Sequence, residues 1–268
     1  VGVSPVHAGR PCYRVGFDDG DAVVTDAKHR WRVVEWSNRP KGEITITTED
    51  MLSRGIGTPY GYRWRLPRSA GFDGTHADLP IEPYLLGLWL GDGSSGAGYI
   101  NSPTSDYQAL SAGIEHTVSN DARVGVTRWL PRNLRSDLRH AGLLGSKHIP
   151  EAYLFADRTQ RLDLLRGLMD TDGHTTRGGS CAFVQKHRAL CEQVAFLVRS
   201  LGCTAGVTEQ WEPRSRTGVI CKTHFSPAFA PFRLRRQAEK ADWRTRRCTT
   251  WPAIISIEPV DSVPVRCI

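Results

Sequence analysis

Two segments of the chain share a spacing of residues that could support metal-assisted hydrolysis. Residues 85–93 are LLGLWLGDG, and residues 165–173 are LRGLMDTDG. Each pattern predicts a helix whose last turn delivers a carboxylate, Asp92 in the first segment and Asp172 in the second. A carboxylate at a helix C-terminus opposes the helix dipole, so its recurrence at matching positions indicates a function. Two such carboxylates beside a basic surface can hold a hard divalent cation for phosphodiester cleavage.

Glycines at matching places predict how the two helices meet. Gly87 and Gly167 lie two residues into each segment, where they would let the helices approach backbone to backbone. Gly93 and Gly173 follow the aspartates, where a glycine can end a helix in a left-handed conformation. The two carboxylates are therefore expected at one shared seam.

A lysine between the two segments is a candidate electrostatic helper. Lys147 lies in GSKHIP, residues 145–150, just ahead of the helix that leads into the second segment. An ammonium group there could polarise the attacking water or stabilise developing charge. The matching place in the second half is residues 232–237, FRLRRQ, so Arg235 or Arg236 is the expected partner. Asp170 has only Leu90 as its counterpart, so it is expected to pack or to support the other acids.

Composition limits the class of protein. The 268 residues carry 35 Lys and Arg against 28 Asp and Glu, a formal net charge of +7, so an anionic partner such as nucleic acid is expected. Seven cysteines without regular or CxxC spacing, and no signal peptide, favour a reduced, cytoplasmic protein over a secreted or zinc-binding one. No apolar run is long enough for a membrane span. The glycine-rich segment 91–96 lacks the Gly-Lys-Ser/Thr ending of a phosphate-binding loop.

The chain is expected to divide into a β-rich module interrupted by a helical one. Residues 13–17 and 22–25 alternate around Asp18-Asp19-Gly20, which predicts a hairpin, and residues 44–47 alternate again. Helical patterns begin at Pro83, a residue suited to a first helical turn. Short strands are expected again at 253–257 and 263–268. The simplest arrangement is a module at residues 81–247 inserted between residues 1–80 and 248–268.

The inserted module repeats itself. Asp92 and Asp172 are 172 − 92 = 80 residues apart, and each segment is followed by a strand-like stretch and an amphipathic helix. The halves are expected at about 81–160 and 161–247. Leucines at 130, 134 and 138 predict a helix in the first half, and the apolar residues at 190, 194, 197 and 201 predict its match, capped by Gly202.

Basic clusters indicate where a duplex would lie. Residues 122–147 hold six Lys or Arg against one acid, and residues 233–247 hold seven against two acids. Such clusters bind phosphate backbones, while side chains after each acidic segment could read bases in the major groove. The candidate base readers are Tyr99, Asn101, Arg177 and Gln185. The candidate DNA-binding set also includes Arg123, Arg128, Arg132, Arg135, Arg139, Lys186 and Arg233.

The paired segments, the Lys-His-Ile-Pro between them and LVRSLG at 197–202 resemble the two-motif LAGLIDADG (dodecapeptide, DOD-type) homing endonucleases carried by inteins. The resemblance implies an α+β fold: two pseudo-symmetric αββαββ units forming a DNA-binding saddle, inserted in an all-β Hint splicing domain. It implies Asp92 and Asp172 as ligands of Mg²⁺, which Mn²⁺ could replace, and Lys147 as the active-site lysine. It further implies a monomer, a double-strand break in a long asymmetric DNA site, and a host protein such as a replicative helicase.

The flanks resemble intein splicing motifs. Asp26-Ala27-Lys28-His29-Arg30-Trp31 resembles the motif of the splicing histidine, and residues 262–268 resemble the start of the C-terminal motif. His29, Trp31 and Cys267 match the class 3 inteins, in which an internal cysteine is the nucleophile. Asp26 stands where many inteins have threonine, and both intein ends are missing, so this chain is not expected to splice by itself.

Two alternatives to an active endonuclease remain open. One is a DNA-binding protein that has kept the saddle but not the cleavage, and the intact acids argue against it. The other is a splicing element with a decayed nuclease, against which the missing ends argue.

Overall fold

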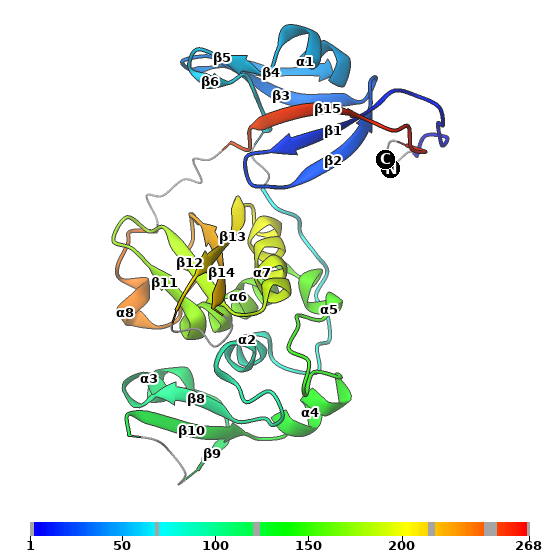
Figure 1. Ribbon diagram of the computed structural model, residues 1–268. Helices are drawn as coiled ribbons and strands as arrows, with labels where there is room; N and C mark the ends of the chain where they lie inside the picture. The colour runs from blue at the N-terminus through cyan, green and yellow to red at the C-terminus, as the bar shows by residue number, and fades with distance from the viewer. Residues whose placement is uncertain (1–2, 68–69, 120–123, 214–217, 244–250, 267–268) are drawn as a thin grey trace. The chain divides into compact units, whose positions relative to one another are not determined.

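The computed structural model describes residues 3–67, 70–119, 124–213, 218–243 and 251–266. Strands and helices form two compact units (Figure 1): residues 1–69 with 249–268, and residues 70–248. The predicted insertion of one module into another is thus observed, but residues 70–80 pack with the inserted unit instead of the β-rich one. No helix in the described ranges has the length and apolar composition to cross a membrane.

The first unit is built from two three-stranded antiparallel sheets. One has the order β15-β1-β2, from Ile254–Val260, Cys12–Phe17 and Ala22–Asp26, and the other the order β4-β3-β7, from Pro40–Thr47, Arg30–Trp36 and Trp64–Arg65. A short hairpin, β5 (Gly57–Thr58) with β6 (Gly61–Tyr62), and α1 (Thr48–Arg54) complete it. The predicted hairpin is confirmed as β1–β2. Because β15 pairs along β1, segments near both ends of the chain join one sheet.

The strand predicted at 263–268 is not formed in its described part. Within residues 263–266 the only pairing is an isolated bridge between Val265 and His7. Pro264 lacks an amide hydrogen, so this stretch cannot sustain a regular ladder.

The second unit contains two halves with the same topology. The first half comprises α2 (Pro83–Asp92), β8 (Ile100–Pro103), α3 (Thr104–Leu110), β9 (His116–Val118), β10 (Val126–Pro131), α4 (Leu134–His140) and α5 (Glu151–Leu154). The second half comprises α6 (Arg158–Asp172), β11 (Gly173–Thr175), β12 (Cys181–Gln185), α7 (Arg188–Ser200), β13 (Ala205–Trp211), β14 (Val219–Phe225) and α8 (Arg235–Ala238). The sheet orders β8-β10-β9 and β11-β12-β14-β13 correspond strand for strand, and the bridge of Gly93 with Ile100 takes the place of β11.

This topology confirms the duplication but corrects the predicted pairing of helices. The counterpart of α7 is α3, and the counterpart of α4 is α8. Leu130 lies on β10, whereas Leu134 and Leu138 lie on α4, so the leucine spacing runs across a strand-to-helix turn. Asn133 makes that turn in a left-handed conformation, with φ of 59°.

The first segment of the second unit, residues 70–82, is held against the rest of that unit by polar contacts. Arg161, fully buried on α6, donates to the carbonyl oxygens of Ala156, Ser200 and Phe72. The backbone of Ala77 exchanges two hydrogen bonds with the side chain of Gln160. These contacts explain why residues 70–80 belong to the inserted unit.

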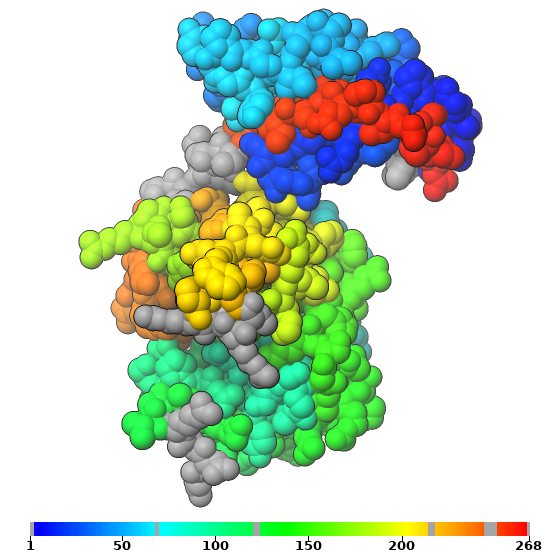
Figure 2. All heavy atoms as spheres, viewed as in Figure 1, coloured from blue at the N-terminus to red at the C-terminus, as the bar shows by residue number. Residues whose placement is uncertain are grey.

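Side chains of both halves of the second unit contribute to one core. Its fully buried members include Leu86, Leu88 and Trp89 of α2, Leu164, Leu165 and Leu168 of α6, Trp129 of β10 and Phe183 of β12. The loop that joins β11 and β12 projects from the surface of this unit (Figures 1 and 2).

Candidate functional site

The two predicted helices exist and end at the predicted acids. α2 begins with Pro83 at its first turn, where the Glu82 side chain accepts from the amide of Leu85, and it ends at Asp92. α6 ends at Asp172. The predicted close approach is confirmed, because a Cβ on Gly87 would lie 2.4 Å from the carbonyl oxygen of Leu164.

The glycines that follow the acids serve a different purpose from the predicted one. Gly93 has φ of −75° and Gly173 has φ of −99°, so neither is left-handed. A Cβ at Gly93 would lie 2.3 Å from the carbonyl oxygen of Trp89, and one at Gly173 would lie 2.5 Å from that of Met169. Glycine is needed here because the chain turns sharply against its own helix.

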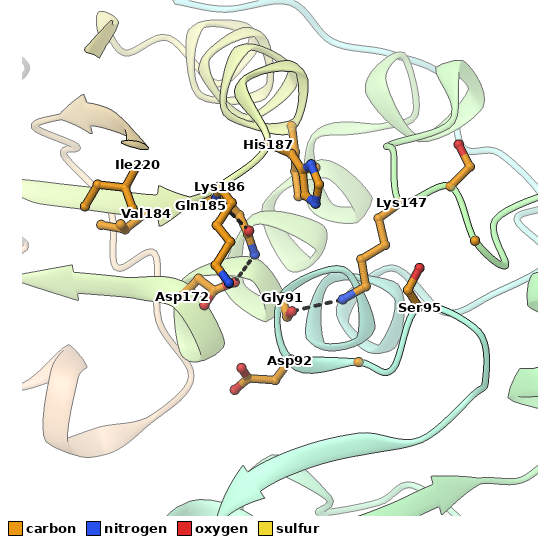
Figure 3. A pocket seen from close by; sticks show the side chains of 14 residues that line it. Gly91, Asp92, Ser95, Lys147, Asp172, Val184, Gln185, Lys186, His187 and Ile220 are labelled. Atoms are coloured by element: carbon orange, nitrogen blue, oxygen red, sulfur yellow. Dashed lines mark hydrogen bonds between the residues drawn. The ribbon is translucent and has the colours of Figure 1, made fainter. Parts of the chain in front are cut away.

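Asp92 and Asp172 face one cleft of about 780 Å³ (Figure 3). Both carboxylates come from helix ends at the α2–α6 seam, and the two charges interact with each other. The polar side chains that line this cleft are Asp92, Ser95, Ser146, Lys147, Asp172, Gln185, Lys186 and His187. Residues from both halves therefore form one site.

Lys147 is anchored at the end of α2. Its Nζ donates to the carbonyl oxygens of Leu90 and Gly91, at 3.0 Å each, and lies 5.1 Å from the centre of the Trp89 ring. The ammonium group thus satisfies carbonyls that a helix end leaves without partners, and it opposes the unfavourable dipole near Asp92. Burial lowers the pKa of Lys147 to about 8, against the opposite effects of Asp172 and Asp92.

Gln185 holds the second carboxylate. Its Nε2 donates to Oδ2 of Asp172 at 2.7 Å. Burial, and then the charge of Asp92, raises the pKa of Asp172 to about 6, although Gln185 and Lys147 act in the opposite direction. Burial also raises the pKa of Asp92, and Lys147 opposes that shift. The site concentrates negative charge that its surroundings compensate only in part.

These residues fit a hard divalent cation. Among the described residues, neither carboxylate forms an ion pair within 4.0 Å, and no cluster of three or more His, Cys, Asp and Glu is found. The protein would therefore supply two carboxylate ligands, with water completing the coordination. Mg²⁺ is bound in this way in many proteins, because it keeps several waters and needs one or two carboxylates.

The predicted arginine partners of Lys147 do not line the cleft. Arg236 forms an ion pair with Asp106 at 2.6 Å, and Arg235 forms one with Glu239 at 2.5 Å. Both lie on α8, the counterpart of α4, whereas Lys147 follows α4. The true counterpart would follow α8, and residues 244–250 in that stretch lie outside the described residues.

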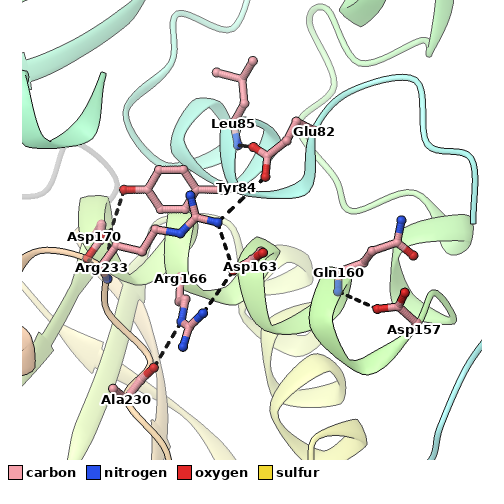
Figure 4. A network of polar contacts seen from close by, with 10 residues as sticks. All are labelled: Glu82, Tyr84, Leu85, Asp157, Gln160, Asp163, Arg166, Asp170, Ala230 and Arg233. Atoms are coloured by element: carbon pink, nitrogen blue, oxygen red, sulfur yellow. Dashed lines mark hydrogen bonds and ion pairs between the residues drawn. The ribbon is translucent and has the colours of Figure 1, made fainter. Parts of the chain in front are cut away.

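Asp170 has the packing role expected of it (Figure 4). Buried on α6, it accepts from the hydroxyl of Tyr84 at 2.8 Å and from the backbone amides of Arg233 and Leu234. Arg233 stacks over the Tyr84 ring at 3.9 Å and pairs with Asp163 at 3.0 Å. This network fixes the segment before α8 to α6, and it holds Arg233 in an internal contact.

The other predicted DNA-binding residues fall into two groups. Arg132 is paired with Glu115 at 2.9 Å. No ion pair within the described ranges involves Arg128, Arg135, Arg139, Arg177 or Lys186. Arg123 lies outside the described residues.

Two of the predicted base readers lie near Asp92. Asn101 of β8 is directly opposite Arg128 of β10, so the two side chains share a sheet face. Asn101 donates to the carbonyl oxygen of Asp92 at 3.2 Å, and Arg128 lies 5.1 Å from the ring centre of Tyr99. Arg177 lies in the projecting β11–β12 loop.

The first unit contains a separate small cavity of about 100 Å³ beside His29. Asp26 and His7 also line it, and Arg10 donates to the buried carboxylate of Asp26 at 2.8 Å. Burial lowers the pKa of His29, and Asp26 opposes this shift.

Trp31 packs against His29, which lines this cavity. Its ring lies edge-on to His29 at 4.8 Å, and its Nε1 donates to Oγ1 of Thr48 at 2.9 Å. Cys267 lies outside the described residues, one position after Arg266, which lines the cavity.

Sequence reasoning missed three contributions to these sites. Gln185 was considered only as a candidate base reader, which stays a prediction, and its hydrogen bond to Asp172 was not expected. His187 was not considered, although its position between Lys186 and α7 places it in the same cleft as Asp92 and Asp172 (Figure 3). The sequence did not indicate a role for His7, because this residue comes to lie beside His29 through its long-range bridge to Val265.

The chain has sequence similarity to a known protein family and to a helicase. The LAGLIDADG-like domain family matches residues 159–238. The chain is similar to the replicative DNA helicase DnaB of Mycobacterium intracellulare, with 34% identity over 295 residues that cover 100% of this chain and 48% of the helicase. It thus spans about half the length of the curated relative it matches.

Solved structures that are similar to this chain include two of I-DmoI. The complex of I-DmoI with DNA and Mn has 18% identity and a TM-score of 0.38, with 55% of this chain and 89% of that chain covered. A variant of I-DmoI with its target DNA in the presence of Mg has 17% identity and a TM-score of 0.38, with the same coverage of 55% and 89%.

Proposed function

We propose that this chain is a member of the LAGLIDADG family and a divalent-metal-dependent endonuclease that cleaves double-stranded DNA at a specific site. The observation that carries the proposal is the pairing of Asp92 and Asp172 at the ends of α2 and α6 in one cleft with Lys147. Two carboxylates that can bind a metal ion and a buried ammonium group that can stabilise negative charge suit phosphodiester hydrolysis.

Each residue has a defined part in this chemistry. Asp92 and Asp172 would hold the cation, which when bound supplies Lewis acidity and lowers the pKa of water. Gln185 orients Asp172 through its hydrogen bond. Lys147 is held by two carbonyl groups within the cleft, where its charge stabilises the negative charge that develops on the phosphate. We propose Mg²⁺ as the physiological ion, with Mn²⁺ able to replace it.

The faces of the two sheets supply the DNA-binding surface. Arg128 and Asn101 lie together on the first sheet, and the loop carrying Arg177 extends the second. The two halves differ in side chains: Lys147 has no established counterpart, and Asp170 corresponds to Leu90. A single chain with two unequal halves would bind an asymmetric site as a monomer.

Cleavage of a DNA library tests this proposal. The protein is incubated with Mg²⁺ and duplexes of random sequence, and new ends are identified by sequencing. We expect site-specific double-strand breaks that disappear with chelator and in Asp92→Asn and Asp172→Asn, both of which should still bind DNA. Binding without cleavage by the unmutated chain would instead favour a DNA-binding protein that has lost nuclease activity.

The cavity beside His29 favours a second candidate function in the first unit, acyl transfer during protein splicing. An imidazole next to a buried carboxylate and a buried tryptophan suits activation of a peptide junction. We propose that the chain is part of an intein in a helicase-like host, with Cys267 as the nucleophile. A precursor that carries this chain between segments of its host protein should cleave at its upstream junction, and His29→Ala and Cys267→Ala should each abolish this. Unchanged cleavage by the Cys267 variant would remove it as the nucleophile.

A further inference from the structure

We propose that Arg135 and Arg139 form a clamp for one DNA backbone phosphate, at a hollow outside the catalytic cleft. The inference rests on the DNA-binding part of the proposed function and assigns one specific subsite to it. The hollow measures about 370 Å³ and is lined by Leu130, Pro131, Asn133, Arg135, Ser136 and Arg139.

The architecture of α4 turns both arginines toward this hollow. Leu134 and Leu138 are buried in the core, with 1% and 0% of their surface exposed, whereas Arg135 and Arg139 are exposed. Each arginine follows a buried leucine by one residue, so it lies on the solvent-exposed flank of the helix beside the leucine stripe. The two arginines are four residues apart and therefore lie one above the other on that flank.

The hollow continues the proposed DNA-binding face of the first sheet. Leu130 and Arg128 are two residues apart on β10, so their side chains share a face, while Trp129 between them is buried in the core. A duplex on this face would meet Arg128 and then the hollow.

The charges around the hollow favour the binding of an anion. Within the described ranges neither Arg135 nor Arg139 forms an ion pair, whereas neighbouring Arg132 is paired with Glu115. Like charges at this helical spacing destabilise a helix. Two guanidinium groups beside one hollow suit the paired hydrogen bonds that a phosphate accepts.

Contact with the loop that follows Asp92, residues 93–99, fixes the position of the clamp. A Cβ on Gly98 would lie 2.9 Å from the backbone nitrogen of Arg135 and 3.0 Å from its Cα, so the loop after Asp92 packs directly on the start of α4. Ser95 of the same loop lines the catalytic cleft. A phosphate held by the clamp would therefore set the register of the duplex relative to Asp92.

Salt-dependent binding to a labelled duplex of arbitrary sequence tests the clamp. Fluorescence anisotropy over about 50 to 200 mM KCl gives the slope of log Kd against log salt, which changes by about 0.9 for each phosphate contact. The variants are Arg135→Gln, Arg139→Gln and the double change. The matched control is Arg188→Gln with Arg235→Gln, which removes the same charge from exposed arginines that already pair with Glu192, Glu209 and Glu239.

We expect the double variant to lose about 0.9 of the slope and to bind about three- to tenfold more weakly. Each single variant should lose nearly as much of the slope and of the affinity as the double variant, because both arginines are needed to hold the phosphate. Lysine at both positions should keep the slope but recover only part of the affinity. All variants should keep the thermal midpoint of the parent, since the changed side chains are exposed.

Three results would overturn the clamp. A double variant with the slope of the parent would show that no phosphate binds there. An equal loss in the control pair, or strictly additive single losses, would show that the arginines act only as general positive charge. Absence of salt-dependent binding by the unmutated chain would overturn the DNA-binding proposal itself, which the other two results leave intact.

Discussion

Gly87 and Gly167 face each other at the α2–α6 seam, so that a Cβ on either would lie 2.9 Å from the Cα of the other. No larger residue fits either position without a shift of backbone. The two helices carry Asp92 and Asp172 at their ends, so the distance between the backbones sets the distance between the carboxylates.

Gly87→Ala should destabilise the second unit and impair the site. The added methyl group must push the helices apart, and such overpacking costs about 1–3 kcal/mol. We expect a lower thermal midpoint together with a loss of cleavage that exceeds any loss of DNA binding. Gly96→Ala is the control, because a Cβ at Gly96 meets nothing within 4 Å. Equal midpoints for the two variants would contradict the proposed constraint.

Lys147→Met should reduce the rate of DNA cleavage by about 100-fold, the size of effect seen when one preorganised donor is removed. Binding of the duplex should remain within a fewfold of the parent. Lys186→Met provides the control, since Lys186 lines the same cleft but is exposed. Single-turnover cleavage and anisotropy separate the two effects. Comparable rate losses in both variants would assign Lys147 only a general electrostatic role.

Local sequence patterns predicted the parts of the site that depend on one helix or one turn. The ends of α2 and α6, the close approach at Gly87 and the β1–β2 hairpin all follow from residue spacing within a short window. These features are determined by helix period, glycine size and turn chemistry, which act between near neighbours in the chain.

Features that depend on tertiary pairing were predicted poorly. The leucine spacing from 130 to 138 suggested one helix, but a left-handed Asn133 divides it between β10 and α4. The bond from Gln185 to Asp172 arises from the position of β12 beside the end of α6. Nothing in the sequence near residue 70 indicated that distant arginines would bind this segment.

The segment 70–82 should be required for a stable second unit. A fragment of residues 70–248 is expected to unfold cooperatively, whereas a fragment of residues 81–248 removes the Phe72 acceptor from buried Arg161. A buried donor left without a partner costs about 1–3 kcal/mol. Chemical denaturation measures the difference. Arg161→Met in the shorter fragment should restore part of the lost stability, and identical midpoints for the two fragments would contradict this role.

Asp172→Asn should stabilise the metal-free protein at pH 7.5. The pKa of Asp172 is raised from 3.8 to about 6 on folding, so the folded state holds this proton more tightly than the unfolded chain. Its favourable contribution is complete below about pH 4 and is lost as the pH rises through 6. The shift corresponds to roughly 3 kcal/mol between the two protonation states.

The variant and the parent should therefore have similar midpoints near pH 4 in the presence of chelator, with the variant more stable at pH 7.5. Asp163→Asn is the opposite control, because Asp163 pairs with Arg166 and Arg233 and its loss should destabilise the fold at pH 7.5. Mg²⁺ should raise the midpoint of the parent at pH 7.5 but not that of Asp172→Asn, since binding to the folded state adds to stability by mass action. A parent more stable than Asp172→Asn at pH 7.5 without metal would mean that the carboxylate is well compensated in the fold, and that the cleft has no need of a cation.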